Sequence, residues 1–124
     1  MKILNGIDLV EIERFTLLDR RIMDRFIQRV YTKAEIAEGN GSYEYYAGRF
    51  AAKEAVVKTL GTGIGEIHWQ DVEILTNREG APILTLHRKA ALTAKQLKVI
   101  SWGLSISHTR RIAIAQAVAL SDLE

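Results

Sequence analysis

The sequence predicts an α+β fold in which an antiparallel sheet packs on a buried central helix. Residues 100–108 and 112–120 alternate between large and very small side chains, which is typical of paired strands. Residues 42–60 have helical spacing and carry small or apolar groups on nearly every side, the pattern of a buried helix. No internal repeat, linker or low-complexity tract divides the chain. We therefore expect residues 1–124 to form one domain.

The composition is that of an ordinary soluble chain. The protein has 124 residues, a formal net charge of +2 and no cysteine. A chain of this length can bury a core without disulfides, so a reducing compartment is compatible with it. No apolar run approaches the roughly 20 residues that span a bilayer. Residues 1–8 lack the apolar region and cleavage site of a signal peptide. We expect a cytoplasmic protein without a membrane partner.

The first elements combine a strand with a basic helical segment. Residues 3–10 read as a strand that carries Asp8 near its end, and residues 11–30 have helical spacing in one or two pieces. An apolar stripe follows this helical segment through Phe15, Leu18, Ile22, Phe26 and Val30. A neighbouring strip carries the basic side chains of Arg14, Arg21, Arg25 and Arg29. Because these side chains share one side, we expect them to present one basic surface.

Capping residues predict the boundaries of the next two helices. Thr32 and Glu35 match a capping box, and the helix that they open is expected to end at residues 39–41. Ser42 can cap the following helix, which runs to about Leu60 and stops at residues 61–63. Residues 61–65 are rich in glycine, but they follow a helix and therefore do not match a phosphate-binding loop, which opens one.

Glu54 and Lys58 lie one turn apart on the buried helix, and Glu54 admits two interpretations. A carboxylate on a buried face must find a cation or lose its charge. Lys58 could satisfy it as an i,i+4 ion pair, or Glu54 could be a ligand in a functional site. Asp8 could likewise be a solvated surface group or a ligand. The residues alone leave both questions open.

The second half of the chain reads as strands around one more helix. Residues 71–76 and 83–87 look like strands joined through residues 77–80, and residues 88–97 form a plausible amphipathic helix. The terminal hairpin turns at residues 109–111, and we expect His108 to pair with Ile112, so that large residues face large ones. The small residues would then contact the central helix. The bulky face would carry Ile100, Trp102, Leu104, Ile112, Ile114 and Val118.

The chemistry-bearing residues favour a hard metal ion over nucleophilic catalysis. No Ser–His–Asp or Cys–His arrangement and no zinc-type spacing is present. Carboxylates with few histidines suit Mg²⁺, which is commonly held by one or two carboxylates plus waters and substrate phosphates. His108 precedes Arg110 and Arg111, a setting suited to anions. His68 and His87 belong to no such group and are interpreted as surface or packing residues.

Four ordered segments of the chain resemble those of one known family. They are Gly6-Ile7-Asp8-Leu9-Val10-Glu11-Ile12-Glu13-Arg14-Phe15, Gly48-Arg49-Phe50-Ala51-Ala52-Lys53-Glu54-Ala55-Val56-Val57-Lys58, Gly61-Thr62-Gly63 and Ser105-Ile106-Ser107-His108-Thr109. In this order and spacing they are similar to the signatures of the bacterial holo-(acyl carrier protein) synthases. The second and fourth segments are the most specific, and together the four cover nearly the whole chain.

The resemblance implies a phosphopantetheinyl transferase fold and a homotrimer with active sites at the subunit interfaces. The implied reaction is the magnesium-dependent transfer of 4'-phosphopantetheine from coenzyme A to a serine of apo acyl carrier protein, with adenosine 3',5'-bisphosphate as the second product, in support of fatty acid biosynthesis. It further implies that Asp8 and Glu54 hold Mg²⁺ and that Asp8, Glu54 and Lys58 form the catalytic set. The implied coenzyme A residues are Arg49, Lys53, Lys58, His108 and Thr109, and the implied carrier-docking residues are Arg14, Arg21 and Arg25.

Two positions depart from the family pattern. Leu4 stands where a second glycine is frequent, and Ala81 replaces the lysine of the usual Asn-x-x-Gly-Lys-Pro turn. The first change lies away from the predicted chemistry. The second concerns a turn that contributes to coenzyme A binding in the family.

Two other classes of function are compatible with a small basic α+β domain. One is an RNA-binding module, but no strand has the basic and aromatic pattern of an RRM, and the basic strip lies on a helix. The other is a carrier-protein adaptor without turnover, against which the presence of Asp8, Glu54 and Lys58 argues. We therefore expect no nucleic-acid partner.

Overall fold

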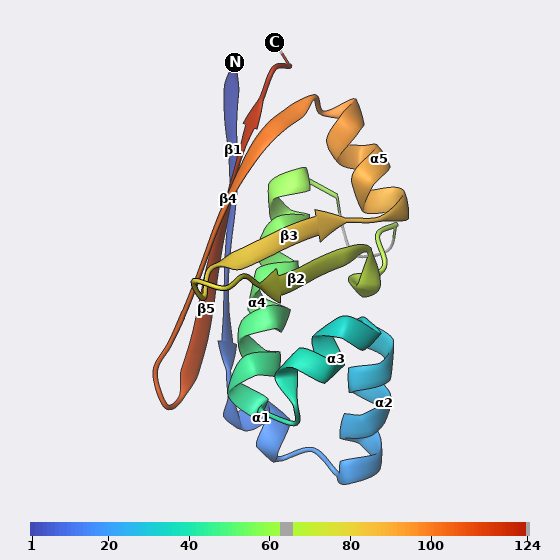
Figure 1. Ribbon diagram of the computed structural model, residues 1–124, viewed down its shortest axis with the longest axis vertical. Coiled ribbons are helices and arrows are strands. Elements are labelled where there is room, and N and C mark those ends of the chain that lie inside the picture. Colours follow the sequence, from blue (N-terminus) through green and yellow to red (C-terminus); the bar gives the residue numbers. More distant parts are fainter. Residues whose placement is uncertain (63–65, 124) are drawn as a thin grey trace.

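The computed structural model describes residues 1–62 and 66–123, so Gly63 and Gly65 of the predicted glycine-rich segment lie outside the described residues (Figure 1). The elements follow in the order β1 (Lys2–Glu11), α1 (Glu13–Thr16), α2 (Arg20–Val30), α3 (Lys33–Gly39), α4 (Tyr43–Leu60), the 3-10 turn η1 (Trp69–Asp71), β2 (Val72–Thr76), β3 (Pro82–Leu86), α5 (Arg88–Gln96), β4 (Val99–His108) and β5 (Ile112–Ser121). This is the predicted α+β arrangement.

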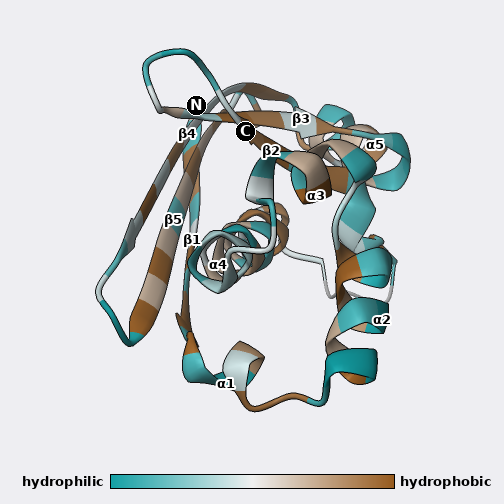
Figure 2. Ribbon diagram, turned by 60° about the horizontal axis from the view of Figure 1, so that its bottom comes forward, coloured by the Kyte–Doolittle hydropathy of each residue, from teal (hydrophilic) through white to brown (hydrophobic). Residues whose placement is uncertain are grey.

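Helix α4 occupies the centre of the fold (Figure 2). The three-stranded sheet lies on one side of it, the β2–β3 pair on another, and α1, α2 and α3 around the rest. Its side chains are buried on nearly all sides, as predicted from their small and apolar character. The Ser42 hydroxyl accepts a hydrogen bond from the Tyr45 amide, and Gly61 ends the helix with φ of 75°, so both predicted boundaries are confirmed.

The sheet has the order β1-β5-β4, and both pairs are antiparallel. The predicted register of the hairpin is wrong, because His108 pairs with Ala113 and not with Ile112. The turn itself sets this register, since the Thr109 amide donates to the Ile112 carbonyl at 2.8 Å and the Thr109 hydroxyl accepts from two turn amides. Large side chains of β4 consequently lie beside alanines of β5 on the face that covers α4.

The shift of register changes which residues the outer face of the sheet exposes. Trp102 and Leu104 pack against the core, contrary to the prediction that they belong to a bulky exposed face. The exposed face instead combines β1 with β5, and Ile100 is exposed at an irregularity of β4. Its large apolar members include Ile3, Ile7, Leu9, Ile112 and Val118.

The predicted basic helical segment consists of two helices. Arg14 lies in α1, whereas α2 begins after Asp19, whose side chain caps it by accepting from the Arg21 amide. The apolar and basic strips are therefore continuous only along α2. Among the residues that the structure describes, no helix is both long and apolar enough to cross a bilayer.

Candidate active site

A glycine on β1 allows the central helix to approach the sheet closely. A Cβ atom on Gly6 would lie 2.3 Å from the Ala55 carbonyl oxygen and 2.8 Å from the Thr59 hydroxyl. Both are closer than atoms can pack, so only glycine fits at this point of contact. Asp8 lies two residues further along β1, on the same face of the strand, and therefore also faces α4.

Lys58 forms its ion pair with Asp8. Its amino group lies 3.0 Å from Asp8 Oδ1 and donates a second hydrogen bond to the Ile7 carbonyl at 3.1 Å. The Lys58 side chain is 54% exposed and the Asp8 side chain 19%, so the lysine remains accessible to a ligand. The alternative in which Lys58 pairs with Glu54 is not the pairing that the structure has.

Glu54 is a partly buried carboxylate next to a second one. Burial raises its pKa first, and the negative charge of Asp8 raises it further, while Lys58 and Arg14 act in the opposite direction. The net shift is upward, so the surrounding positive charge does not fully compensate the ionised Glu54. A positive charge beside both carboxylates would therefore stabilise the ionised Glu54.

This donor set fits Mg²⁺. Asp8 and Glu54 supply hard oxygen donors, and a cation between them would relieve the repulsion that raises the Glu54 pKa. Within the described residues no group of three or more histidine, cysteine or acidic side chains comes together. Two carboxylates are a common protein contribution to a magnesium site that also takes substrate phosphates.

Arg49 lies in the N-terminal half of α4, against β2. Its guanidinium donates to the Ile74 carbonyl at 3.2 Å and to the Thr76 hydroxyl, pairs with Glu38 at 3.3 Å and lies over the Tyr45 ring. Burial raises the pKa of Glu38, but hydrogen bonds from Tyr45 and Thr76 and the charge of Arg49 outweigh it and lower the pKa overall. Arg49 is thus rigidly held, with only a small part of its side chain exposed.

His108 and Thr109 lie at the tip of the β4–β5 hairpin. His108 Nδ1 is 3.9 Å from a Glu44 carboxylate oxygen in the first turn of α4, and the imidazole is half exposed. The Thr109 hydroxyl accepts hydrogen bonds from the Arg111 and Ile112 amides and so orders the turn. Both residues are therefore at the end of the molecule where α4 begins.

The predicted site residues form two groups on opposite sides of α4. Arg49 and Lys58 are nine positions apart, which is about 180° around a helix and roughly 13 Å along its axis. Arg49 accordingly contacts β2, while Lys58 contacts β1. One copy of the chain does not bring the predicted metal ligands and Arg49 together on one surface.

Lys53 is buried, although the family resemblance implied that it contacts coenzyme A. Its side chain is 0% exposed, and its amino group donates to Glu35 Oε1 at 2.8 Å and to the carbonyls of Trp69 and Val72. Burial lowers the Lys53 pKa, and the charge of Glu35 opposes that effect. All three donors of the ammonium have protein partners, so the expected contact between Lys53 and coenzyme A is corrected to a structural role.

Arg14, one of the predicted docking residues, borders an apolar hollow that the sequence analysis missed. Arg14 lines it together with Val10, Phe15, Leu18, Phe26 and Phe50. Three of these rings pack edge to face or tilted against one another. Arg21 and Arg25 are exposed on α2, one turn apart. The spacing of Phe15 and Phe26 was the only sequence signal for this hollow. It indicates an apolar helix face, and it does not show that two separate helices leave a gap between them.

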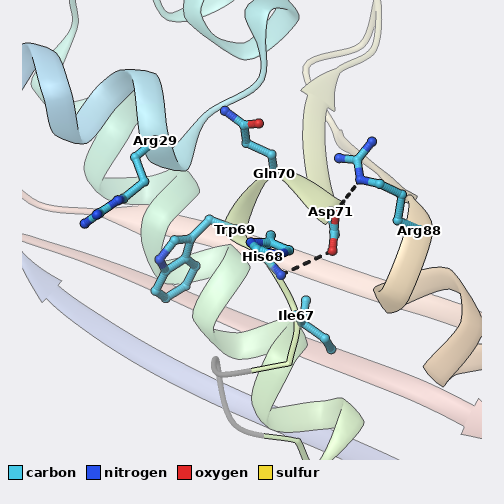
Figure 3. Close-up of a pocket in the computed structure, with 7 residues that line it drawn as sticks. All are labelled: Arg29, Ile67, His68, Trp69, Gln70, Asp71 and Arg88. Carbon is cyan, nitrogen blue, oxygen red and sulfur yellow. Dashed lines mark hydrogen bonds and ion pairs between the residues drawn. The ribbon is translucent and has the colours of Figure 1, made fainter.

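A second hollow lies between the end of α2 and the start of α5 (Figure 3). Buried Asp71 ties η1 to the start of α5, because it accepts from Arg88 Nε at 2.7 Å and from the His68 amide at 3.2 Å. Gln70 donates to the carbonyls of Gln28 in the last turn of α2 and of Tyr31 directly after it. None of the predicted site residues lines this hollow, so it is separate from the carboxylate pair.

The chain is similar to known proteins over nearly its whole length. Residues 5–117 match the model of the 4'-phosphopantetheinyl transferase superfamily. The chain is 41% identical over 120 residues to the holo-[acyl-carrier-protein] synthase of Natranaerobius thermophilus, covering 94% of this chain and 96% of that protein. It is 43% identical over 117 residues to the Solibacter usitatus synthase, covering 91% and 94%. The Helicobacter pylori holo-[acyl-carrier-protein] synthase in complex with coenzyme A superimposes with a TM-score of 0.85 at 33% identity, covering 94% of this chain and 100% of that one.

Proposed function

This chain belongs to the 4'-phosphopantetheinyl transferase superfamily, and from that premise we propose that it converts apo acyl carrier protein to the holo form. The transferred group is 4'-phosphopantetheine from coenzyme A, the acceptor is a serine of the carrier protein, and adenosine 3',5'-bisphosphate is released. The observation that carries the proposal is the cluster of Asp8, Glu54 and Lys58 between β1 and α4.

The proposal includes Mg²⁺ as the cofactor, held by Asp8 and Glu54. The ion would neutralise charge on the pyrophosphate of coenzyme A and orient it for in-line displacement. The chemistry of the two carboxylates supports this assignment, since burial and then the charge of Asp8 raise the pKa of Glu54, and a cation beside both groups would offset the second effect. The transfer is expected to take place in the cytoplasm and to support fatty acid biosynthesis.

Lys58 has the position of a group that stabilises the transferred phosphoryl. Its flexible and exposed ammonium can leave Asp8 and bind a phosphate oxygen beside the two carboxylates. The serine oxygen of the carrier attacks the phosphorus next to pantetheine, and the pyrophosphate P–O bond to the adenosine bisphosphate breaks. The serine proton leaves to water or to a carboxylate. Positioning and charge compensation account for such a reaction without a covalent enzyme intermediate.

The direct test is incubation of the protein with apo carrier protein, coenzyme A and Mg²⁺. Mass spectrometry of the carrier should show the addition of one phosphopantetheine. Turnover in the wild type that persists in excess EDTA would contradict the magnesium assignment, and an unmodified carrier would contradict the activity. Retention on RNA without coenzyme A binding would instead favour the RNA-binding alternative.

We further propose that the working form is a homotrimer with the coenzyme A site shared between two copies. Arg49 and His108 lie near the start of α4, whereas Lys58 lies near its end on the opposite side, so one copy does not present both groups on one surface and a second copy would complete the site. The exposed apolar face of β1 and β5 supports such an assembly, since faces of this kind are commonly covered by another chain.

Leu9→Asp is expected to dissociate the trimer. Leu9 is 54% exposed on the outer face of β1, so an aspartate there keeps the single chain folded but places a charge in the interface. Sedimentation velocity at micromolar concentration should show a trimer for the wild type and a monomer with little turnover for the variant. Leu92→Asp, at a 48% exposed position on α5, is the matched control and should remain trimeric. A fully active wild-type monomer would contradict the shared site.

Carrier docking is proposed for the basic side of α1 and α2. Arg21 and Arg25 lie one turn apart, with exposed Leu18 and Ile22 beside them, and would face an acidic helix of the carrier. Arg14 also influences Glu54, so it lies between the docking surface and the carboxylate pair. Its replacement would mix effects on docking with effects on the metal site.

Arg21→Glu is therefore the cleaner test of docking. We expect the KM for the carrier to rise roughly tenfold at low salt, because surface charges mainly steer encounter. The difference from wild type should shrink at about 1 M salt, where the Debye length is about 3 Å. The KM for coenzyme A should not change. Lys95→Glu on α5 is the charge-matched control, and an equal effect of both variants would count against a local docking surface.

A further inference from the structure

A buried polar cluster links the central helix to three neighbouring elements. The Lys53 ammonium donates to Glu35 Oε1 and to the carbonyls of Trp69 and Val72. The Glu35 carboxylate in turn accepts from the amides of Thr32 at 2.9 Å and of Ile74 at 2.8 Å. Both charged side chains are 0% exposed. The cluster therefore ties α4 to α3, to η1 and to β2.

The stability that such an ion pair contributes does not explain why Lys53 and Glu35 are buried here. Two charges removed from water lose much of their hydration, and a buried ion pair often stabilises no more than apolar side chains of the same volume. Buried polar groups have another effect, because their hydrogen bonds are satisfied in only one arrangement of the surrounding elements. A role in positioning is consistent with that effect.

The apolar packing of the central helix does not by itself fix the rotation of the helix about its axis. Its small and apolar residues surround the axis, with alanines at 47, 51, 52 and 55 and valines at 56 and 57. Hydrophobic burial is therefore nearly the same for several rotations of α4 about its own axis. The rotation must be fixed by contacts that depend on direction, which are the close approach at Gly6 and the hydrogen bonds of polar side chains.

A small rotation would matter for the proposed reaction. Side-chain tips lie about 5–6 Å from a helix axis, so a turn of about 10° moves them by about 1 Å. Displacements of that size can cost on the order of 10²-fold in rate. Glu54 directly follows Lys53 in α4, so a rotation of the helix at Lys53 also displaces Glu54. The Lys58–Asp8 ion pair cannot fix this rotation throughout the reaction, because it must open when Lys58 binds phosphate. The Lys53 cluster does not take part in that exchange and remains in place.

We propose that Lys53 is a positioning residue, whose buried contacts with Glu35, Trp69 and Val72 fix the rotation of α4 and so hold Glu54 beside Asp8. This inference rests on the proposed function. It differs from the expected role in coenzyme A binding, because Lys53 acts here through α4 and touches no substrate.

The test compares the affinity for coenzyme A with and without Mg²⁺, measured by calorimetry. The variant Lys53→Met/Glu35→Gln removes both charges from the cluster and keeps similar volume. We expect its metal-free affinity to stay within about twofold of wild type, while the gain in affinity on adding Mg²⁺ falls about tenfold. The turnover number should fall by a similar or larger factor, and the KM for the carrier should remain unchanged.

Val56→Ala is the matched control for lost stability. Val56 is buried on the same helix, and its truncation is expected to lower the free energy of unfolding without touching the polar cluster. It should keep the full magnesium-dependent gain. If the double variant does not fold, Lys53→Arg is used in its place. Arginine retains the charge but is too large for the cluster, so the gain in coenzyme A affinity on adding Mg²⁺ should again fall.

The possible outcomes separate this inference from the proposed function. A folded double variant, or a folded Lys53→Arg, with the wild-type magnesium gain would overturn the positioning role. An equal loss in Val56→Ala would do the same, because it would assign the effect to stability alone. A wild type that binds coenzyme A with no magnesium gain would instead refute the metal assignment, and a wild type without turnover would refute the activity.

Discussion

Glu54→Gln is expected to lower turnover by about a hundredfold or more, the scale seen when one stabilising group is removed from a transition state. The glutamine keeps the shape of the side chain but removes one of two charges that would hold Mg²⁺. Part of the activity should return at high magnesium concentration, because the site would be weakened and not abolished. Turnover measured against magnesium concentration for both proteins tests this.

The stability of the same variant distinguishes a ligand from a structural ion pair. The raised pKa of Glu54 means that the folded state binds the proton more tightly than the unfolded state. Its contribution to stability is thus present below the unfolded pKa and is lost as the pH rises through the folded pKa. At neutral pH, Glu54→Gln should leave the free energy of unfolding of the metal-free protein unchanged or higher.

A fall in stability at neutral pH together with full turnover would instead indicate a structural carboxylate. Glu66→Gln is the control for the chemical change, because Glu66 is an exposed carboxylate outside the set of proposed site residues. We expect it to leave both turnover and its magnesium dependence near the wild-type values.

Gly6→Ala is expected to have the largest effect on folding. The new methyl group would lie 2.3 Å from the Ala55 carbonyl oxygen and 2.9 Å from Lys58 Cβ, so β1 and α4 must move apart. Overpacking of this kind typically costs about 1–3 kcal/mol and sometimes more. Because the same contact brings Asp8 to α4, the folded fraction should also lose magnesium-dependent turnover. Denaturant unfolding and turnover per folded molecule measure the two effects.

Gly48→Ala provides the comparison at a glycine of α4 itself. Its methyl group would lie 3.2 Å from the Ile106 Cγ2 methyl, so Ile106 would have to move by only a few tenths of an ångström, far less than the displacement that the contacts at Gly6 require. Alanine also favours the helix by about 1 kcal/mol relative to glycine. We expect little net change in stability and normal turnover. Equal losses in the two variants would show that the close approach at Gly6 is not the decisive contact.

Local signals in the sequence were sufficient for most of the secondary structure. The capping box of Thr32 and Glu35 forms as predicted, with the Glu35 carboxylate accepting from the Thr32 amide. The burial of α4 follows from its small and apolar residues. These predictions succeeded because caps and periodicity depend on residues within a few positions of one another.

The register of the terminal hairpin shows where local pattern fails. Both strands alternate strictly, so pairings of His108 with Ile112 or with Ala113 satisfy the alternation equally well. The Thr109 turn decides between them, and the choice moves Trp102 and Leu104 from the outer face to the core side. A shift of one residue reverses the faces of a strand relative to its partner.

The sequence by itself determined the chemistry available to this protein: two carboxylates, a lysine one turn after Glu54, and a helix that must be buried. Only the tertiary structure decided how these groups are used. It pairs Lys58 with Asp8, 50 positions away, in place of Glu54, and it buries Lys53 against Glu35. It also separates Arg49 from Lys58 by α4. The reason is physical, because partners for a charge on a buried helix are set by which elements pack on each side, and that packing depends on contacts distant in sequence.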